Sequence, residues 1–199
     1  FALQGIASGD ETMHFFKSPS PELKELFGPL GITQHSSGLE GFLFPDTYRI
    51  FRNASLTDIT KKMLENFHSK VTPELREEIL RQRKTLFEIV TMASLIEKEV
   101  VSDADRALVS GVLYKRLEAE IALQVDATIA YAQMQNGKRK AQNDGKISLE
   151  DTRINSPYNT YLYRGLPRGP IANPGLSAIR AAIFPRSSPY LYYLSAPDG

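Results

Sequence analysis

Cysteine and tryptophan are both missing from the 199 residues of the chain. The lack of cysteine excludes disulfide frameworks, thiolate zinc sites and cysteine nucleophiles. Neither sign of charge is in large excess, because the chain has 24 Lys and Arg and 23 Asp and Glu, which gives a formal net charge of +1. A chain this close to neutral has no general field that attracts nucleic acid or anionic lipid. No apolar run in the sequence approaches the roughly 20 residues that span a bilayer.

The motifs of several cofactor chemistries are absent as well. The three histidines, His14, His35 and His68, are scattered and lack the close spacing of a helical metal site, so we predict no metal. There is no phosphate loop and no Gly-rich dinucleotide fingerprint, so we predict no other cofactor. Ser94 and Lys98 lie four residues apart, but the motifs that accompany Ser-Lys pairs in serine hydrolases are missing.

The chain has enough apolar material for one core. Hydrophobic residues make up 42% of the sequence, which predicts one main domain, assigned to residues 39–199. Residues 1–38 are rich in small, polar and turn residues and predict a linker or the remnant of a preceding module. The sequence starts without Met and stops within a predicted strand and turn, so we expect a fragment of a longer protein.

Helix start signals are frequent in the middle of the chain. Pro73 fits the first turn of a helix that ends near Arg83, and a short helix is predicted over residues 177–183. The other signals are side chains that can accept hydrogen bonds from the free N–H groups of a first turn. They occur at Ser55 or Thr57, at Thr85 with Glu88, and at Ser102 with Asp105.

Three segments predict extended structure instead. Residues 39–51 are rich in aromatic side chains around a Pro-Asp turn, residues 123–128 alternate polar and apolar side chains, and residues 190–194 form an apolar run. We therefore predict an α+β fold, in which a helical centre packs against a small, mostly antiparallel sheet. Residues 135–146 are polar and basic and predict a solvated loop rather than an RNA contact, so no nucleic-acid partner is expected.

The acidic residue Glu97 stands out on the third predicted helix. At 3.6 residues per turn it falls near the centre of an aliphatic stripe, whereas Glu88 and Glu99 point the other way. A carboxyl group among aliphatic neighbours resists ionisation, because desolvation penalises the anion, and a carboxylic acid still protonated near neutrality suits a general acid. Glu97 is therefore the candidate proton donor. The alternative is a structural Glu that snorkels or pairs with Lys98 or Arg106.

A second polar cluster follows the next predicted helix. Gln124, Asp126 and Thr128 occupy alternating positions, so they share one face if the segment is extended. Such a face can hydrogen-bond a polar ligand or a second carboxyl group. A polar strand surface and an Asp-based turn remain equally open.

A third cluster lies in residues 156–175, which combine aromatic rings, amides and tightly turning backbone. Tyr rings such as that of Tyr158 stack on sugar faces, and the amide of Asn159 can bind hydroxyl groups with a paired donor and acceptor. A turn-rich structural loop is the alternative.

Four groups of motifs, taken in order, resemble the endolytic murein transglycosylases of the YceG-like family. They are Leu-Glu-Gly-Phe-Leu-Phe-Pro-Asp-Thr-Tyr at 39–48, Ala-Ser-Leu-Ile-Glu-Lys-Glu at 93–99, Leu-Gln-Val-Asp-Ala-Thr at 123–128, and Tyr-Asn-Thr-Tyr at 158–161 with Gly-Leu-Pro and Asn-Pro-Gly after it. The resemblance covers residues 39–199. The catalytic Glu of the family lies in the second motif and corresponds to Glu97.

The resemblance implies a lytic transglycosylase that cuts peptidoglycan glycan strands internally and uses no water. Glu97 would protonate the glycosidic oxygen between N-acetylmuramic acid and N-acetylglucosamine, and then accept the proton of the muramoyl C6 hydroxyl as this attacks C1. The product is a 1,6-anhydromuramoyl end. One residue serves as acid and base, so a second carboxylate is dispensable. The expected substrate-binding residues are Glu40, Gln124, Asp126, Tyr158 and Asn159, with Asp126 best placed to stabilise positive charge.

The resemblance also implies a cellular setting. Members of the family are anchored in the bacterial inner membrane, face the periplasm, and start with a transmembrane helix and a LysM-like module. We therefore expect residues 1–38 to be the remnant of that module, the anchor to lie outside this sequence, and peptidoglycan synthases to be partners. Members also continue beyond Pro-Asp-Gly at 197–199, into a further segment with His and Asn near the site.

Two other functions fit the same residues. One is a cell-wall glycan-binding or scaffold module, in which Glu97 is only a structural acid. The other is an inverting glycoside hydrolase that uses Glu97 and Asp126 with water.

Overall fold

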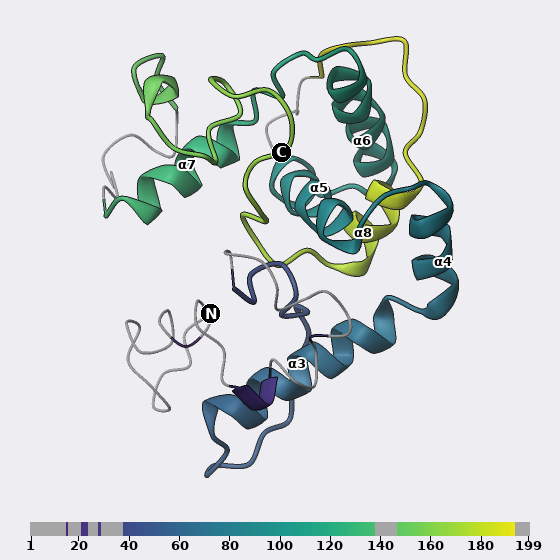
Figure 1. Cartoon of the computed structure of the whole chain (residues 1–199), viewed down its shortest axis with the longest axis vertical. Coiled ribbons are helices and arrows are strands. Elements are labelled where there is room, and N and C mark those ends of the chain that lie inside the picture. Colours follow the sequence, from purple (N-terminus) through teal and green to yellow (C-terminus); the bar gives the residue numbers. More distant parts are fainter. Residues whose placement is uncertain (1–14, 16–20, 24–27, 29–37, 138–146, 194–199) are drawn as a thin grey trace.

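The structure, a computed structural model, describes residues 15, 21–23, 28, 38–137 and 147–193 (Figure 1). Within these residues it contains helices and no strand, so the predicted α+β fold with a small sheet is wrong for the part described. The helices whose bounds lie within residues 38–137 and 147–193 are α3 (Leu56–Lys70), α4 (Pro73–Arg81), α5 (Leu86–Glu99), α6 (Asp103–Glu118), α7 (Asp126–Gln135), the 3-10 helix η2 (Asp151–Arg153) and α8 (Leu176–Ile183).

The helix starts predicted at Ser55 and Thr85 are confirmed with their capping bonds, whereas Ser102 is the N-cap residue of α6 but makes no side-chain capping bond. The Ser55 hydroxyl accepts from the backbone N–H of Asp58 at 3.1 Å and begins α3, and the Asp58 carboxylate accepts from the backbone N–H of Ser55 at 2.9 Å. Thr85 and Glu88 form the same reciprocal box at the start of α5. Each box satisfies two N–H groups that the helix itself leaves without partners. Pro73 occupies the first turn of α4, as predicted.

Helix α5 is the centre of the fold. It packs against α8, α6, α7 and α4, and Figure 1 shows α6 and α8 beside it. Every residue from Ile89 to Ile96 is buried, and a helix that is apolar on all sides belongs inside a core. The single apolar stripe predicted for this helix is therefore too narrow.

Residues 39–51 do not form the predicted strand. Residues 38–43 turn, and residues 44–51 have no regular structure. Their aromatic side chains pack inward instead of facing a neighbouring strand: the ring of Phe42 lies 5.3 Å from Phe67 of α3 and 6.5 Å from Phe87 of α5. The backbone N–H groups of Gly41 and Leu43 donate to the amide oxygen of Asn173, at 2.8 and 3.2 Å. The Asn173 side chain thus satisfies backbone N–H groups that would bond to a neighbouring strand in a sheet.

The other two predicted strands are also wrong. The backbone of Gln124 is left-handed, with φ of 52°, which turns the chain directly into α7. At the C-terminal end, residues 190–193 bend along α6, and position 194 lies outside the described residues. The carbonyls of Pro189 and Leu191 accept hydrogen bonds from Lys115 and Arg116 of α6, at 2.7 and 3.4 Å, rather than from a strand.

Gly41 allows the closest approach between the turn at residues 38–43 and the rest of the core. Its φ is +91°, and a Cβ atom there would lie 2.5 Å from Pro170 Cγ and 2.7 Å from Val90 Cγ1. We expect Gly41→Ala to lower the free energy of unfolding by more than about 3 kcal/mol, because it adds overpacking to backbone strain. Gly165 has the same φ, but a Cβ atom there would meet nothing within 4 Å, so Gly165→Ala should cost only about 1 kcal/mol. If denaturant unfolding showed equal losses of unfolding free energy for the two variants, the clash expected at Gly41 would be wrong.

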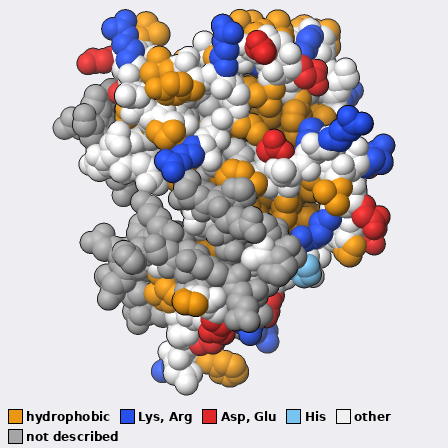
Figure 2. Space-filling model, viewed as in Figure 1, with side chains coloured by type: hydrophobic (Ala, Val, Ile, Leu, Met, Phe, Trp, Pro, Cys, Tyr) orange, Lys and Arg blue, Asp and Glu red, His pale blue; other side chains and the backbone are white. Residues whose placement is uncertain are grey.

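The surface carries charges of both signs. Figure 2 shows Lys and Arg side chains interspersed with Asp and Glu over the described part of the visible face, with no patch of one sign. This distribution matches the net charge of +1. No helix in the described ranges is long and apolar enough to cross a membrane. The predicted loop at residues 135–146 lies mostly outside these ranges, as does most of the predicted linker at residues 1–38.

Candidate functional site

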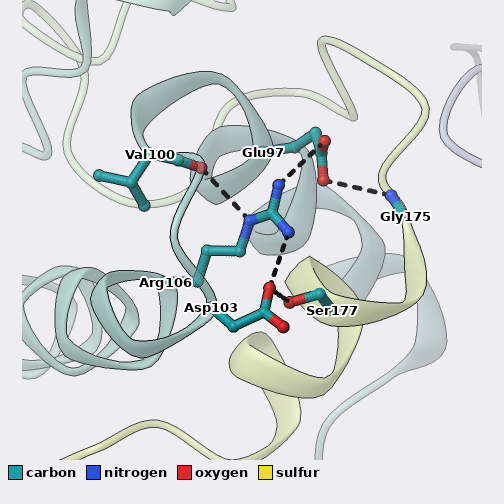
Figure 3. Close-up of polar contacts among 6 residues, drawn as sticks. All are labelled: Glu97, Val100, Asp103, Arg106, Gly175 and Ser177. Carbon is teal, nitrogen blue, oxygen red and sulfur yellow. Dashed lines mark hydrogen bonds and ion pairs between the residues drawn. The ribbon is translucent and has the colours of Figure 1, made fainter. Parts of the chain in front are cut away.

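Glu97 lies in the last turn of α5 and is held from two other parts of the chain (Figure 3). Its Oε1 accepts a hydrogen bond from Arg106 Nη2 on α6 at 3.3 Å, and its Oε2 accepts one from the backbone N–H of Gly175 at 3.2 Å. Gly175 is the N-cap residue of α8, where the helix dipole favours a negative charge. The Glu97 side chain is 28% exposed. Its carboxyl group is therefore fixed in place and still reachable from solvent.

Arg106 connects three elements around this carboxyl group. Its side chain is only 13% exposed, and its Nε donates to the carbonyl of Val100 at 3.3 Å. Its Nη1 donates to the carboxylate of Asp103 at 3.3 Å, and the hydroxyl of Ser177 on α8 donates to the same carboxylate oxygen (Figure 3). The planar guanidinium thus has a partner in each of three directions, a geometry that the ammonium of a Lys does not reproduce.

The surroundings of Glu97 differ from the aliphatic ones that the periodicity predicts. The ion pair with Arg106, which the sequence left open as an alternative, is present. The apolar periodicity of α5 did not predict these neighbours of Glu97. The helix is buried on all sides up to Ile96, and its last turn meets the polar starts of α6 and α8.

Glu99, two residues further along, is the acid that burial affects most clearly. Burial raises the pKa of its carboxyl group, and the nearby charge of Asp126 raises this pKa further. The hydroxyl of Tyr193, which donates to Glu99 Oε2 at 2.9 Å, and the backbone N–H of Ala127 both lower it. The sequence placed Glu99 on the side away from Glu97, and the two acids do have separate partners, but the partial burial of Glu99 was not predicted.

Gln124 and Asp126 lie at the start of α7, although not on a shared strand face. The amide oxygen of Gln124 accepts from Arg116 Nη2 at 2.6 Å, and Arg116 is 4% exposed. The carboxylate of Asp126 accepts a hydrogen bond from the hydroxyl of Tyr161. Burial is the main reason that the pKa of Tyr161 is raised. Thr128 is buried, whereas Gln124 and Asp126 are exposed, so the predicted common face of these three residues is wrong.

Glu40 and Tyr158 come together through a residue that the sequence did not single out. The hydroxyl of Tyr131 on α7 donates to the carboxylate of Glu40, and the rings of Tyr131 and Tyr158 lie 4.7 Å apart at 58°. Burial raises the pKa of both tyrosines. Tyr131 lies on α7, which begins within the strand predicted over residues 123–128 and was not predicted as a helix, so no sequence signal marked its direction.

Asn159 organises the loop that it belongs to. It is 1% exposed, and its Nδ2 donates to the carbonyls of Thr152 and Ile154 at 2.9 and 2.7 Å. Its Oδ1 accepts from the backbone N–H groups of Tyr161 and Leu162, at 2.8 and 3.3 Å. This geometry favours the structural alternative that the sequence left open, and the sugar-binding role of Asn159 stays a prediction.

We expect Asn159→Ala to lower the free energy of unfolding by about 2 to 4 kcal/mol, because it leaves buried backbone groups without partners. Asn155 provides the matched control. It is exposed, and its amide oxygen accepts a hydrogen bond from the hydroxyl of Tyr163 at 2.9 Å. Asn155→Ala should cost less than about 1 kcal/mol. Denaturant unfolding of both variants measures the difference, and similar losses would contradict the role given to Asn159.

The structure brings the predicted site residues into separate clusters. Glu97 sits with Arg106 at one side of the α5 end, and Asp126 lies near Glu99. Within the part of the chain described, no hydrogen bond or ion pair joins Glu97 directly to Glu40, Gln124, Asp126, Tyr158 or Asn159. No group of three or more His, Cys, Asp or Glu side chains among the described residues is arranged to hold a metal ion.

The fold and site define a helical protein with one anchored, partly exposed carboxyl group at the end of its central helix, where an acid–base centre can act on a bound ligand. The sequence profile of the YceG-like family matches residues 6–199. The chain therefore belongs to the YceG-like family.

Named relatives and a solved structure agree with this membership. The chain is 41% identical over 162 residues to an endolytic murein transglycosylase of Bacillus subtilis, and 37% identical over 157 residues to one of Streptococcus pneumoniae D39. These alignments cover 81% and 79% of this chain, but only 43% and 28% of the two relatives. The crystal structure of a putative YceG-like protein from Listeria monocytogenes superposes with a TM-score of 0.81 at 30% identity, over 95% of this chain and 62% of that one.

Proposed function

We propose that the chain is part of an endolytic peptidoglycan lytic transglycosylase and that Glu97 is its general acid and base. The names of the relatives from B. subtilis and S. pneumoniae support the activity. The observation that carries the role of Glu97 is its fixed, partly exposed carboxyl group at the end of α5. A proton donor must keep a defined position and yet be open to the substrate.

The reaction requires one carboxyl group in two protonation states. Glu97 starts as the acid and gives its proton to the oxygen that links C1 of N-acetylmuramic acid to N-acetylglucosamine, and the C1–O bond breaks. The C6 hydroxyl of the same muramic acid then attacks C1 and gives its proton to Glu97. The products are a 1,6-anhydromuramoyl end and a free N-acetylglucosamine hydroxyl, and Glu97 regains its proton.

The hydrogen bonds at Glu97 leave room for this proton transfer. Each carboxyl oxygen accepts one bond from the protein, and a carboxylate oxygen has two lone pairs. Arg106 and Gly175 therefore fix the group and still leave each oxygen able to carry or receive a proton.

The remaining predicted residues are proposed to bind the glycan. The ring of Tyr158 offers an apolar face to a sugar, and the carboxylates of Glu40 and Asp126 accept hydrogen bonds from hydroxyl groups. Gln124, two residues before Asp126, is exposed and adds an amide. We further propose that the protein acts outside the cytoplasm at the bacterial inner membrane, on peptidoglycan strands, with peptidoglycan synthases as partners.

Mass spectrometry of purified peptidoglycan digested with this chain tests the proposal. We expect new 1,6-anhydromuramoyl ends. New reducing ends would instead indicate the inverting hydrolase that uses Glu97 and Asp126. Strand binding without any cleavage would indicate the glycan-binding scaffold module.

A further inference from the structure

Gln124 has a backbone conformation that its place in the chain does not explain. Its φ is 52°, in the left-handed region, where residues other than Gly are strained. Arg83 and Glu120 share this conformation, but each lies two residues after the end of a helix, where a left-handed residue is common. Gln124 instead precedes α7. Strain of this kind persists only where the surrounding structure holds it, and it concentrates at functional sites.

Three hydrogen bonds hold this strained segment. The backbone N–H of Gln124 donates to the carbonyl of Thr160 at 3.0 Å, and the backbone N–H of Val125 donates to the Thr160 hydroxyl at 3.0 Å. The third bond fixes the side chain, because Arg116 Nη2 donates to the amide oxygen of Gln124 at 2.6 Å. Both the backbone and the side-chain amide of Gln124 are therefore held, although the residue is exposed.

Arg116, the donor to this amide, is a buried cation. It is 4% exposed, and it forms no ion pair in the described part of the chain. Its Nε and Nη2 donate to the carbonyl of Ala122 at 3.0 and 2.6 Å, and its Nη1 donates to the carbonyl of Leu191 at 3.4 Å. Burial of a charge is costly, so its partners here need a reason beyond core packing. Arg116 joins the segment before α7 to residues 191–192.

Tyr192 contacts the same guanidinium. Its ring centroid lies 5.0 Å from Arg116 Cζ, so one side of the ring lies against the cation, while Tyr192 as a whole is 71% exposed. One buried guanidinium therefore sets the positions of an exposed aromatic ring and of the exposed amide of Gln124.

The bond from Arg116 decides what the Gln124 amide can bind. Because the oxygen accepts from Arg116, the NH2 group is left to donate, and it has no partner among the residues that the structure describes. A ligand group at this place must therefore accept hydrogen bonds. The exposed carboxylate of Asp126, two residues on, disfavours an anionic acceptor. A neutral carbonyl, such as that of an acetamido group, fits the donor, and the Tyr192 ring offers an apolar face to the sugar that carries it.

We propose that Arg116 is a positioning residue that presents the NH2 group of Gln124 to the acetamido carbonyl of an N-acetylated sugar, with the Tyr192 ring as a second contact to that sugar. The inference rests on the function proposed above, from which the ligand is a strand of amino sugars. It adds the chemical group that Gln124 recognises. A site with a fixed donor discriminates against an analogue that lacks the acceptor, because the donor then has no partner.

Binding of two neutral oligosaccharides tests the proposal. Tetra-N-acetylchitotetraose carries an acetamido group on every ring, and cellotetraose carries a shorter hydroxyl at the same carbon. NMR titration of the unchanged chain should give a Kd at least about 10-fold lower for the N-acetylated sugar. Gln124→Glu should raise that Kd about 10-fold and leave the Kd for cellotetraose within about 2-fold, because the carboxylate still accepts from Arg116 but has no NH2 group to donate.

Asn155→Asp is the matched control. Asn155 is also exposed, and its amide oxygen accepts a bond from the Tyr163 hydroxyl at 2.9 Å, so the change likewise removes an NH2 group and adds a negative charge. It should leave both Kd values within about 2-fold.

Variants of the other two residues test their separate roles. Tyr192→Phe keeps the ring and should bind both sugars as the unchanged chain does, whereas Tyr192→Ala should raise both Kd values about 5-fold. Arg116→Lys should raise the Kd for the N-acetylated sugar about 5-fold, because an ammonium group does not reproduce the planar contacts that hold Gln124. If Arg116→Lys does not fold, Gln124→Glu still decides, since it keeps the guanidinium and its bonds.

Three results would overturn the inference: equal Kd values for the two sugars in the unchanged chain, no effect of Gln124→Glu on the N-acetylated sugar, or equal losses for both sugars in Gln124→Glu. Binding of these sugars is measured separately from cleavage of peptidoglycan. Selective binding without cleavage would contradict the proposed function alone, and cleavage without selective binding would contradict the inference alone.

Discussion

Replacing Glu97 with glutamine is expected to lower the rate of glycan cleavage at least about 100-fold while strand binding changes little. The amide has nearly the same shape, and its oxygen can still accept the N–H of Gly175, but it has no acidic proton to give and does not take one up. The loss should therefore appear in kcat rather than in KM. Counting of new chain ends over time measures the rate, and co-sedimentation with peptidoglycan measures the binding.

The matched control is Glu77→Gln, which changes an exposed acid on α4. It should retain full activity. Melting temperatures of both variants must stay close to that of the unchanged chain, so that loss of activity is not loss of fold. Cleavage by Glu97→Gln within a few fold of the unchanged rate would show that another group supplies the proton.

Substitution of Arg106 is expected to have the second largest effect. Arg106→Ala removes the donor to Glu97 Oε1 and leaves the carboxylate of Asp103 and the carbonyl of Val100 without the same guanidinium. Because a misplacement of about 1 Å can cost about 100-fold in rate, we expect kcat to fall by about that factor. Arg106→Lys keeps the charge but not the planar three-way geometry, so it should fall between Arg106→Ala and the unchanged chain.

A control from α8 separates position from charge. Arg180 is exposed, and Arg180→Ala removes the same charge from the surface without touching Glu97. It should cleave glycan at nearly the unchanged rate. If Arg106→Lys were as active as the unchanged chain, charge alone would be sufficient and the proposed alignment of Glu97 by the guanidinium would be wrong.

The helices were predictable where local chemistry decides their starts. Ser55 with Asp58, and Thr85 with Glu88, satisfy their own first-turn donors, so their signal needs no tertiary partner. Helix α7 was missed for the opposite reason. Its first residues follow Val125, which has no side-chain oxygen to cap it, and the backbone N–H of Val125 donates to the hydroxyl of Thr160, far along the chain. A signal of this kind is visible only after folding.

The predicted sheet failed because aromatic and alternating residues also suit irregular segments that pack on helices. Phe42 is buried against rings from α3 and α5, and the backbone around it bonds to Asn173, far along the chain. Period-two alternation at residues 123–128 likewise gave way to a left-handed residue, Gln124. The local sequence pattern shows neither which distant side chain accepts a hydrogen bond nor which residue has a left-handed backbone.

The candidate site was predicted in part. Glu97 was found from its place on a helix and from the resemblance of its motif, and Arg106 was considered only as a partner in a structural alternative. The neighbours of Glu97 in the structure come from the starts of α6 and α8, which the periodicity within α5 does not predict. The sequence did not predict the contacts of Tyr131, Glu99 and Tyr193, because these are hydrogen bonds between residues far apart in the chain.

The role of Glu97 in a reaction without water is tested most directly by digesting peptidoglycan in water enriched in oxygen-18. In transglycosylation the new bond at C1 of muramic acid is made by its own C6 oxygen, so we expect the new ends to be 1,6-anhydro sugars without the heavy isotope. Their formation should be lost in Glu97→Gln. Heavy oxygen at C1 of the new muramoyl ends would contradict the mechanism, because it would show that water attacks and that the enzyme is a hydrolase.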